Sequence, residues 1–236
     1  MKRSKKINIE YFIKDLKNTK SYKSIINIFN PVSIFIGGSV AENLYTDSSD
    51  IDIFVILKND KNFSSEELII YYNTYKMTWD SWDVNFIFRT IDDIIKPTNL
   101  FIITGFAKRN IFLYGKNFTN DFILIKYGAF LITQECFSSW PSFINQLLYN
   151  NNNNNNNNNE KPAGHYIYSI ILLCWKFLNK TVNYNFLLLI KNKKSFSNIE
   201  ILKIKALIKE VKKQTSILKY EVLVKEVNDY VIKMFS

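Results

Sequence analysis

Residues 34–57 read IFIGGSVAENLYTDSSDIDIFVIL and carry the strongest structural signal in the sequence. An apolar run breaks at a Gly-Gly-Ser turn, and a second apolar run begins ten residues later with Asp50 and Asp52. In a strand, residues i and i+2 point to the same face, so we expect these two carboxylates to lie side by side. Two like charges so close are costly unless a cation lies between them. Mg²⁺ prefers such oxygen ligands, and the sequence therefore predicts a metal site.

The turn before the carboxylates has the composition of a phosphate-binding loop. Gly37 and Gly38 allow the backbone to approach a phosphate closely. The whole arrangement resembles the signature of the DNA polymerase beta-like nucleotidyltransferase superfamily: an apolar strand, Gly-Ser, about ten residues, then Asp-x-Asp between apolar residues. Here the strand is Val32–Ile36, the Gly-Ser pair ends at Ser39, and ten residues separate Ser39 from Asp50.

The resemblance implies a reaction and a set of site residues. The reaction is the Mg²⁺- or Mn²⁺-dependent transfer of a nucleoside monophosphate from a nucleoside triphosphate to an acceptor hydroxyl, with release of pyrophosphate. Asp50 and Asp52 would hold the metal, as is usual for carboxylates that bridge two divalent ions. Gly38 and Ser39 would bind the β- and γ-phosphates. The chain length suits an acceptor that is a small molecule or a protein better than RNA.

The superfamily also uses a third carboxylate, which binds metal or acts as general base. Asp83 is the candidate, because it lies in the alternating run from Trp82 to Arg89, which is typical of a strand. Asp80 is an alternative in the preceding turn. Asn85 lies on the same strand face as Asp83 and offers a neutral ligand.

One position departs from the superfamily pattern. Minimal nucleotidyltransferases often carry Ala-Arg-Gly shortly after Gly-Ser, whereas this chain has Glu42 near the place of the arginine. The change bears on triphosphate affinity rather than on the metal site. A further likeness is the segment 105–116, which ends in Leu-Tyr-Gly, so that the resemblance covers residues 30–118.

These patterns predict an α/β (α+β) fold, with a small mixed sheet and flanking helices followed by a C-terminal helical bundle. We expect a nucleotidyltransferase domain at residues 1–118 and a helical domain at 119–236. The asparagine run at 150–159 buries no apolar surface and is interpreted as a disordered insertion. Helices are predicted by spacing, caps and breakers over residues 9–29, 39–44, 64–76, 165–178, 199–219 and 221–235, and strands over 32–36, 50–57, 82–89 and 112–114.

Charge, cysteine content and apolar stretches indicate the compartment and the partners of the protein. The net charge is +10, and the basic excess lies in residues 160–236, with 14 Lys against 6 Asp and Glu. Cys136 and Cys174 lie far apart in apolar surroundings, which favours buried thiols in a reducing compartment. No signal peptide is evident, and the longest apolar stretch, 166–175, is too short to span a bilayer, so we expect a cytoplasmic protein without a membrane partner.

The basic excess supports one alternative function. The chain could be a catalytically silent nucleotidyltransferase-like module that binds RNA or a protein partner through its basic helical domain. The presence of both Asp50 and Asp52 favours the enzyme, whereas the missing arginine favours the silent module.

Overall fold

The computed structural model describes residues 6–47, 49–58, 63–95, 110–117, 122–133 and 163–235. The chain divides into two compact units. Among the described residues, the first contains 6–95, 110–117 and 231–235, and the second contains 122–133 and 163–230. The predicted domain boundary after residue 118 and the asparagine run at 150–159 both lie outside the described residues.

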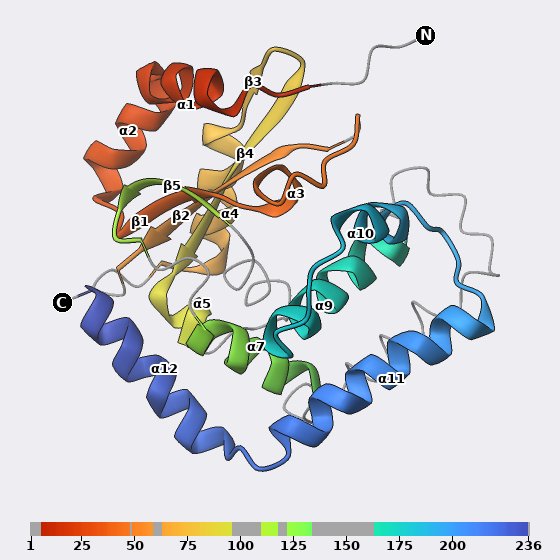
Figure 1. Cartoon of the computed structure of the whole chain (residues 1–236). Helices are drawn as coiled ribbons and strands as arrows, with labels where there is room; N and C mark the ends of the chain where they lie inside the picture. Colours follow the sequence, from red (N-terminus) through yellow and green to blue (C-terminus); the bar gives the residue numbers. More distant parts are fainter. Residues whose placement is uncertain are drawn as a thin grey trace, which may run out of the picture. The chain divides into compact units, whose positions relative to one another are not determined.

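The first unit is built around a five-stranded mixed sheet (Figure 1). Its strands follow the order β3 (Met77–Trp79), β4 (Trp82–Thr90), β2 (Ile51–Leu57), β1 (Ser33–Ile36) and β5 (Ile111–Gly115). Strands β2 and β4 are parallel, and every other neighbouring pair is antiparallel. The mixed sheet with flanking helices confirms the predicted fold class. The elements of this unit are α1 (Ile9–Asn18), α2 (Lys20–Phe29), β1 (Ser33–Ile36), α3 (Gly38–Ala41), β2 (Ile51–Leu57), α4 (Ser65–Tyr75), β3 (Met77–Trp79), β4 (Trp82–Thr90), α5 (Ile91–Ile95) and β5 (Ile111–Gly115).

The helical pattern predicted over residues 9–29 is two helices rather than one. Thr19 has an extended backbone, with φ −67° and ψ 150°. Its hydroxyl donates to Leu16 O at 2.7 Å and accepts from Tyr22 N at 3.2 Å, so one side chain ends α1 and caps α2. A threonine hydroxyl competes for backbone partners in this way, and periodicity alone does not reveal it.

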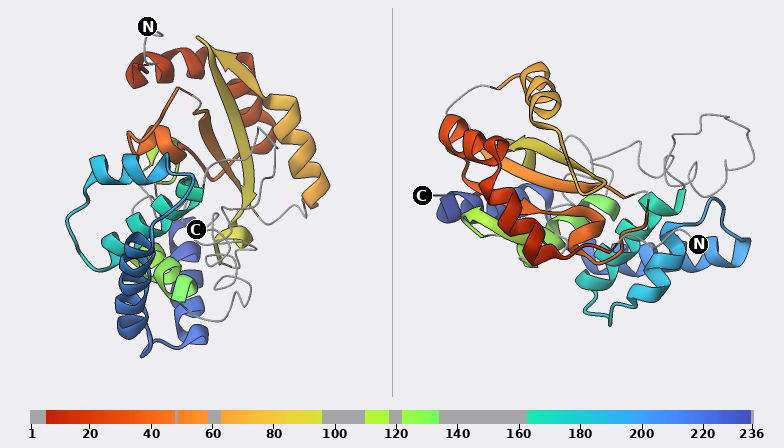
Figure 2. Two further views of the ribbon diagram at one scale, coloured as in Figure 1. Left: turned by 90° about the vertical axis from the view of Figure 1, so that its right-hand side faces the viewer. Right: turned by 90° about the horizontal axis from the view of Figure 1, so that it is seen from above.

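The core of the first unit lies on one face of the sheet. Helices α1, α2 and α4 pack against this face (Figure 2), which β2 and β4 supply through alternate apolar side chains. Phe29 of α2 links the layers, because its ring contacts Tyr71 of α4 at 4.7 Å and Phe88 of β4 at 5.2 Å. Asp52 and Asn85 alternate out of this core and are direct neighbours in the β2–β4 register. The fully buried core side chains include Phe12, Leu16, Ile25, Ile34, Ile36, Ile51, Ile53, Val55, Val84 and Phe86.

The second unit consists of helices. Helix α9 (Ala163–Phe177) is buried at residues 163, 164 and 167–174. The hydroxyls of Thr133 in α7 (Phe122–Thr133) and Thr215 in α11 (Asn198–Thr215) lie 2.7 Å apart in the interior of this unit. Cys174 is a buried free thiol, and burial raises its pKa to about 12, whereas Cys136 lies outside the described residues. The helices are α7 (Phe122–Thr133), α9 (Ala163–Phe177), α10 (Tyr184–Lys191), α11 (Asn198–Thr215) and α12 (Tyr220–Phe235).

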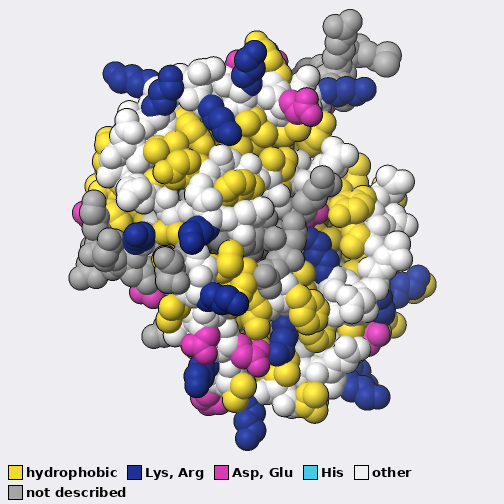
Figure 3. Space-filling view, turned by 60° about the vertical axis from the view of Figure 1, so that its left-hand side comes forward, with side chains coloured by type: hydrophobic (Ala, Val, Ile, Leu, Met, Phe, Trp, Pro, Cys, Tyr) yellow, Lys and Arg dark blue, Asp and Glu magenta, His cyan; other side chains and the backbone are white. Residues whose placement is uncertain are grey.

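Basic side chains are dispersed over the face of the molecule that Figure 3 shows. Within the described ranges, no helix is long and apolar enough to cross a bilayer. Lys and Arg side chains spread over the face that Figure 3 shows, between apolar and uncharged side chains. Some lysines of the second unit are paired with acids, such as Lys126 with Glu226 at 2.7 Å and Lys180 with Glu210 at 2.5 Å.

Helix α11 begins with a capping box, which gives a first testable prediction. Glu200 N donates to Ser197 Oγ at 3.3 Å, and Ser197 N donates to Glu200 Oε2 at 3.0 Å. We expect Ser197→Ala to lower the free energy of unfolding by about 1 kcal/mol, because the first turn loses a partner for a backbone amide. Urea denaturation measures this loss. Ser195→Ala, at an exposed position outside the cap, is the matched control, and an equal loss there would contradict the assignment.

Candidate active site

The Gly-Gly turn after β1 lies directly against Asp52. Gly37 N donates to the backbone oxygen of Asp52 at 2.9 Å, which ties the turn to β2. Gly38 has φ +65°, and a Cβ at this position would lie 2.7 Å from Asp52 Oδ2. Only glycine therefore allows the backbone both this conformation and this approach to the carboxylate. The structure thus brings together Gly38 and Asp52, which the sequence predicted as phosphate- and metal-binding residues.

Ser39 follows in the first turn of α3 and is nearly buried, with 8% of its surface exposed. Its backbone oxygen accepts from Leu44 N at 2.8 Å, which closes the short α3 segment. Glu42, at the place where related sequences often carry arginine, is 1% exposed. The departure from the pattern is therefore a buried acid rather than a solvent-exposed one. The phosphate-binding role of Ser39 stays a prediction.

Asp50 is held by Asn85 of β4, which is itself held by Tyr72 of α4. Asn85 of β4 donates from Nδ2 to Asp50 Oδ2 at 2.9 Å. Tyr72 of α4 donates from its hydroxyl to Asn85 Oδ1 at 3.1 Å. Asn85 is 5% exposed, so this polar contact lies at the edge of the core. The sequence pattern identified Asp50 and Asn85, but it gave no indication of Tyr72.

Asp83 is exposed on β4, where it pairs with Thr78 of the edge strand β3. Asp83 precedes Asn85 by two residues, so both side chains lie on the same face of β4. The described residues contain no group of three or more His, Cys, Asp or Glu side chains arranged to hold a metal ion. Asp50, Asp52 and Asp83 are therefore not gathered into one three-carboxylate group, and the β4 side chain that contacts Asp50 is Asn85. Mutual repulsion of carboxylates favours a neutral neighbour at this place. The role of Asp83 as metal ligand and base stays a prediction, as do the metal-ligand roles of Asp50 and Asp52.

Comparison with known families decides the class of this domain. Residues 19–113, from the start of α2 almost to the end of β5, match the family model of the nucleotidyltransferase domain. These residues form a nucleotidyltransferase domain. The match contains the Gly-Gly turn, both carboxylates of the Asp-x-Asp pair and Asn85, and it confirms the resemblance drawn from the sequence. No curated protein matches the chain.

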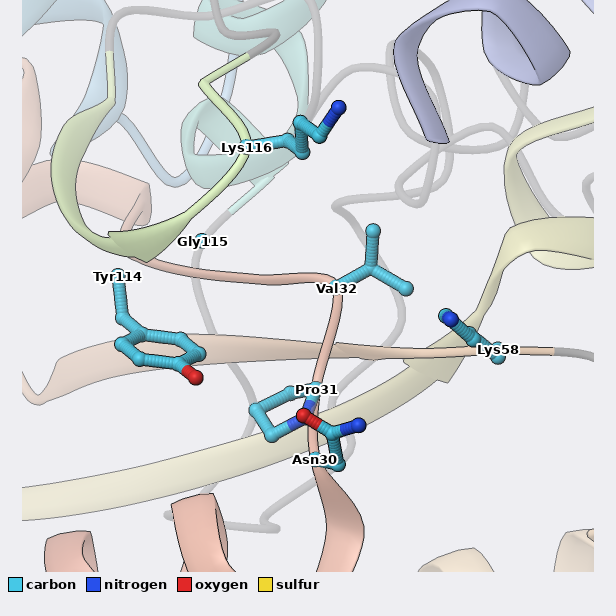
Figure 4. A pocket seen from close by; sticks show the side chains of 7 residues that line it. All are labelled: Asn30, Pro31, Val32, Lys58, Tyr114, Gly115 and Lys116. Atoms are coloured by element: carbon cyan, nitrogen blue, oxygen red, sulfur yellow. The ribbon is translucent and has the colours of Figure 1, made fainter. Parts of the chain in front are cut away.

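The nucleotidyltransferase domain has a second polar feature at the other end of β2. A hollow of about 410 Å³ is lined by Asn30, Pro31, Val32, Lys58, Tyr114, Gly115 and Lys116 (Figure 4). Lys58 directly follows β2, whereas Asp50 directly precedes it, so about 25 Å of extended chain separates the hollow from the carboxylates. The two lysines are exposed. The hollow therefore presents two lysine side chains away from the candidate active site.

Proposed function

We propose that this nucleotidyltransferase domain moves a nucleoside monophosphate from a nucleoside triphosphate to an acceptor hydroxyl, with Mg²⁺ or Mn²⁺ as cofactor. The observation that carries the proposal is the packing of Gly38 against the Asp52 carboxylate, within residues that match the domain family. The favoured acceptors are a small molecule or a protein. The expected location is the cytoplasm.

The residues at the turn have the donor set that a divalent cation with a triphosphate requires. Asp50 and Asp52 supply carboxylate oxygens, which are the ligands that hard cations prefer. Gly38 has no Cβ to collide with the Asp52 carboxylate, and phosphate oxygens are proposed to approach the amides of the turn there. These oxygen donors and the glycine turn support the proposal that the domain takes a divalent metal and a nucleoside triphosphate.

The proposed reaction forms one bond and breaks another at the α-phosphorus. The acceptor oxygen attacks this phosphorus, the bond to the oxygen that bridges the α- and β-phosphates breaks, and pyrophosphate leaves. Asp83 is proposed to take the proton of the acceptor hydroxyl. Gly38 and Ser39 are proposed to hold the β- and γ-phosphates and so orient the leaving group. Bound divalent metal would supply charge neutralisation at the phosphates.

A thermal shift experiment tests whether the site binds its proposed ligands together. Mg²⁺ and a nucleoside triphosphate should raise the Tm by several degrees when added together, and by less when either is added alone. A ligand at about 100 times its Kd contributes about 2.7 kcal/mol. The Lys58→Ala/Lys116→Ala double variant should keep the gain, because its changes lie at the opposite end of β2. A gain that disappears in this variant and persists in Asp52→Asn would place the nucleotide in the lysine-lined hollow and refute the proposal.

A further inference from the structure

Asn85 lies on β4 just beyond the segment that pairs with β3, and next to Asp52 of β2. The last β3–β4 pair joins Met77 to Val84, so Asn85 is the first β4 residue beyond the short edge strand. On the other side of β4, the parallel register places Asp52 of β2 next to Asn85. An amide that is 5% exposed requires hydrogen-bond partners, because its burial is otherwise costly. Asn85 finds them in Asp50 and Tyr72.

The chemistry of the groups fixes the direction of these hydrogen bonds. An ionised carboxylate only accepts, so the group of Asn85 that faces Asp50 must be its NH₂. The amide oxygen of Asn85 then faces Tyr72, whose hydroxyl must donate. The Tyr72 hydroxyl therefore orients the Asn85 amide, and the amide orients one oxygen of the Asp50 carboxylate.

We propose that Asn85 and Tyr72 are positioning residues that hold Asp50 ready for a divalent cation. Asn85 occupies Oδ2 of Asp50 and leaves the second carboxylate oxygen for the metal. A neutral donor keeps Asp50 ordered without adding a third negative charge beside Asp52. Hydrogen-bond partners of metal ligands often govern metal affinity in this way. This inference rests on the proposed function, because it requires Asp50 to bind metal.

The test measures the Tm at increasing Mn²⁺ concentration with the nucleoside triphosphate held constant. The readout is the half-saturating concentration, at which Mn²⁺ gives half of its maximal gain in Tm. Two variants and one control are compared with wild type. Asn85→Ala should raise this concentration by about tenfold or more. Tyr72→Phe removes one hydroxyl and should raise it by about threefold, as expected for one hydrogen bond acting at a distance. Tyr71→Phe is the control, because Tyr71 lies on the same helix with its ring packed against Phe29 and Phe88. It should leave the half-saturating concentration unchanged.

A purely structural role for Asn85 predicts a different pattern. Loss of packing alone would lower the Tm equally at every Mn²⁺ concentration and leave the half-saturating concentration unchanged, which would overturn the proposal. Asn85→Asp is a further discriminator, because a third carboxylate should lower the Tm without metal and enlarge the gain with Mn²⁺. An Asn85→Asp variant with no enlarged gain would also contradict the placement of Asn85 beside the cation.

Failure of the proposed function gives a separate result. If wild type and Asp50→Asn show no Mn²⁺-dependent gain, the metal site itself is refuted, and the positioning role falls with it. If wild type gains and Asp50→Asn does not, the metal site stands. Unchanged half-saturating concentrations in both Asn85→Ala and Tyr72→Phe would then refute the positioning role alone.

Discussion

Gly38→Ala should eliminate the gain in Tm that metal and nucleoside triphosphate produce together, and should also lower the stability of the metal-free protein. The new methyl group would lie 2.7 Å from Asp52 Oδ2, so the carboxylate or the turn must move. Alanine at φ +65° is strained in addition, at a cost of about 1–3 kcal/mol. Thermal denaturation with and without ligands measures both effects.

Gly115→Ala is the matched control for this result. Gly115 also has a positive φ, +79°, and a Cβ there would lie 2.1 Å from Val32 O. Its replacement should lower the Tm strongly, yet the folded protein should keep the half-saturating metal concentration of wild type, because Gly115 pairs with Ser33, at the end of β1 away from the Gly-Gly turn. An equal loss of ligand response in both glycine variants would show that the response reports general stability and not the turn at Gly38.

Asp50→Asn should reduce nucleotidyl transfer by about a thousandfold or more. A bound metal contributes several kcal/mol of transition-state stabilisation, and each 1.4 kcal/mol is a factor of ten in rate. The fold should survive, because an asparagine at position 50 still offers an oxygen to Asn85 Nδ2. The metal-free Tm should equal or exceed that of wild type, since one of two neighbouring negative charges is removed.

The exposed Asp47 provides the control for the Asp50 variant. Asp47→Asn removes the same charge from the same loop, three residues earlier, and should keep the activity and the ligand response. If the metal-free Tm of Asp50→Asn is well below that of wild type, Asp50 contributes to the stability of the fold. This result would contradict the interpretation of Asp50 and Asp52 as a pair that binds a cation.

Local patterns in the sequence predicted most of the elements that position this site. The Ser64–Glu67 capping box predicted α4, and both of its hydrogen bonds are present, at 3.2 Å and 2.8 Å. The apolar runs on either side of the Gly-Gly turn predicted β1 and β2, and Gly115 predicted the short strand β5. In each case the signal lies within a few residues, because caps, turns and alternation are local features.

Features that depend on tertiary pairing were not predicted. The three-residue strand β3 is too short for a pattern and exists through its pairing with β4 across a turn at Asp80 and Ser81, which have φ 41° and 69°. Helix α10 was also missed, since its short apolar run has no distinctive period. In the site, Tyr72, Asn85 and Asp50 come from positions 13 and 35 residues apart, so their contact follows from the sheet order and not from any motif.

A transfer assay with two labels measures directly whether this protein moves a nucleoside monophosphate or a terminal phosphate. The purified protein is incubated with Mg²⁺ or Mn²⁺ and with a cell extract that supplies acceptors. The nucleoside triphosphates are labelled at either the α- or the γ-phosphorus. Wild type should attach the α-label to an acceptor and release the γ-label as pyrophosphate, while Asp50→Asn should do neither. Attachment of the γ-label, equal α-labelling by wild type and Asp50→Asn, or no labelling with any nucleotide would contradict the assignment of Asp50, Asp52 and Gly38 to metal-dependent nucleotidyl transfer.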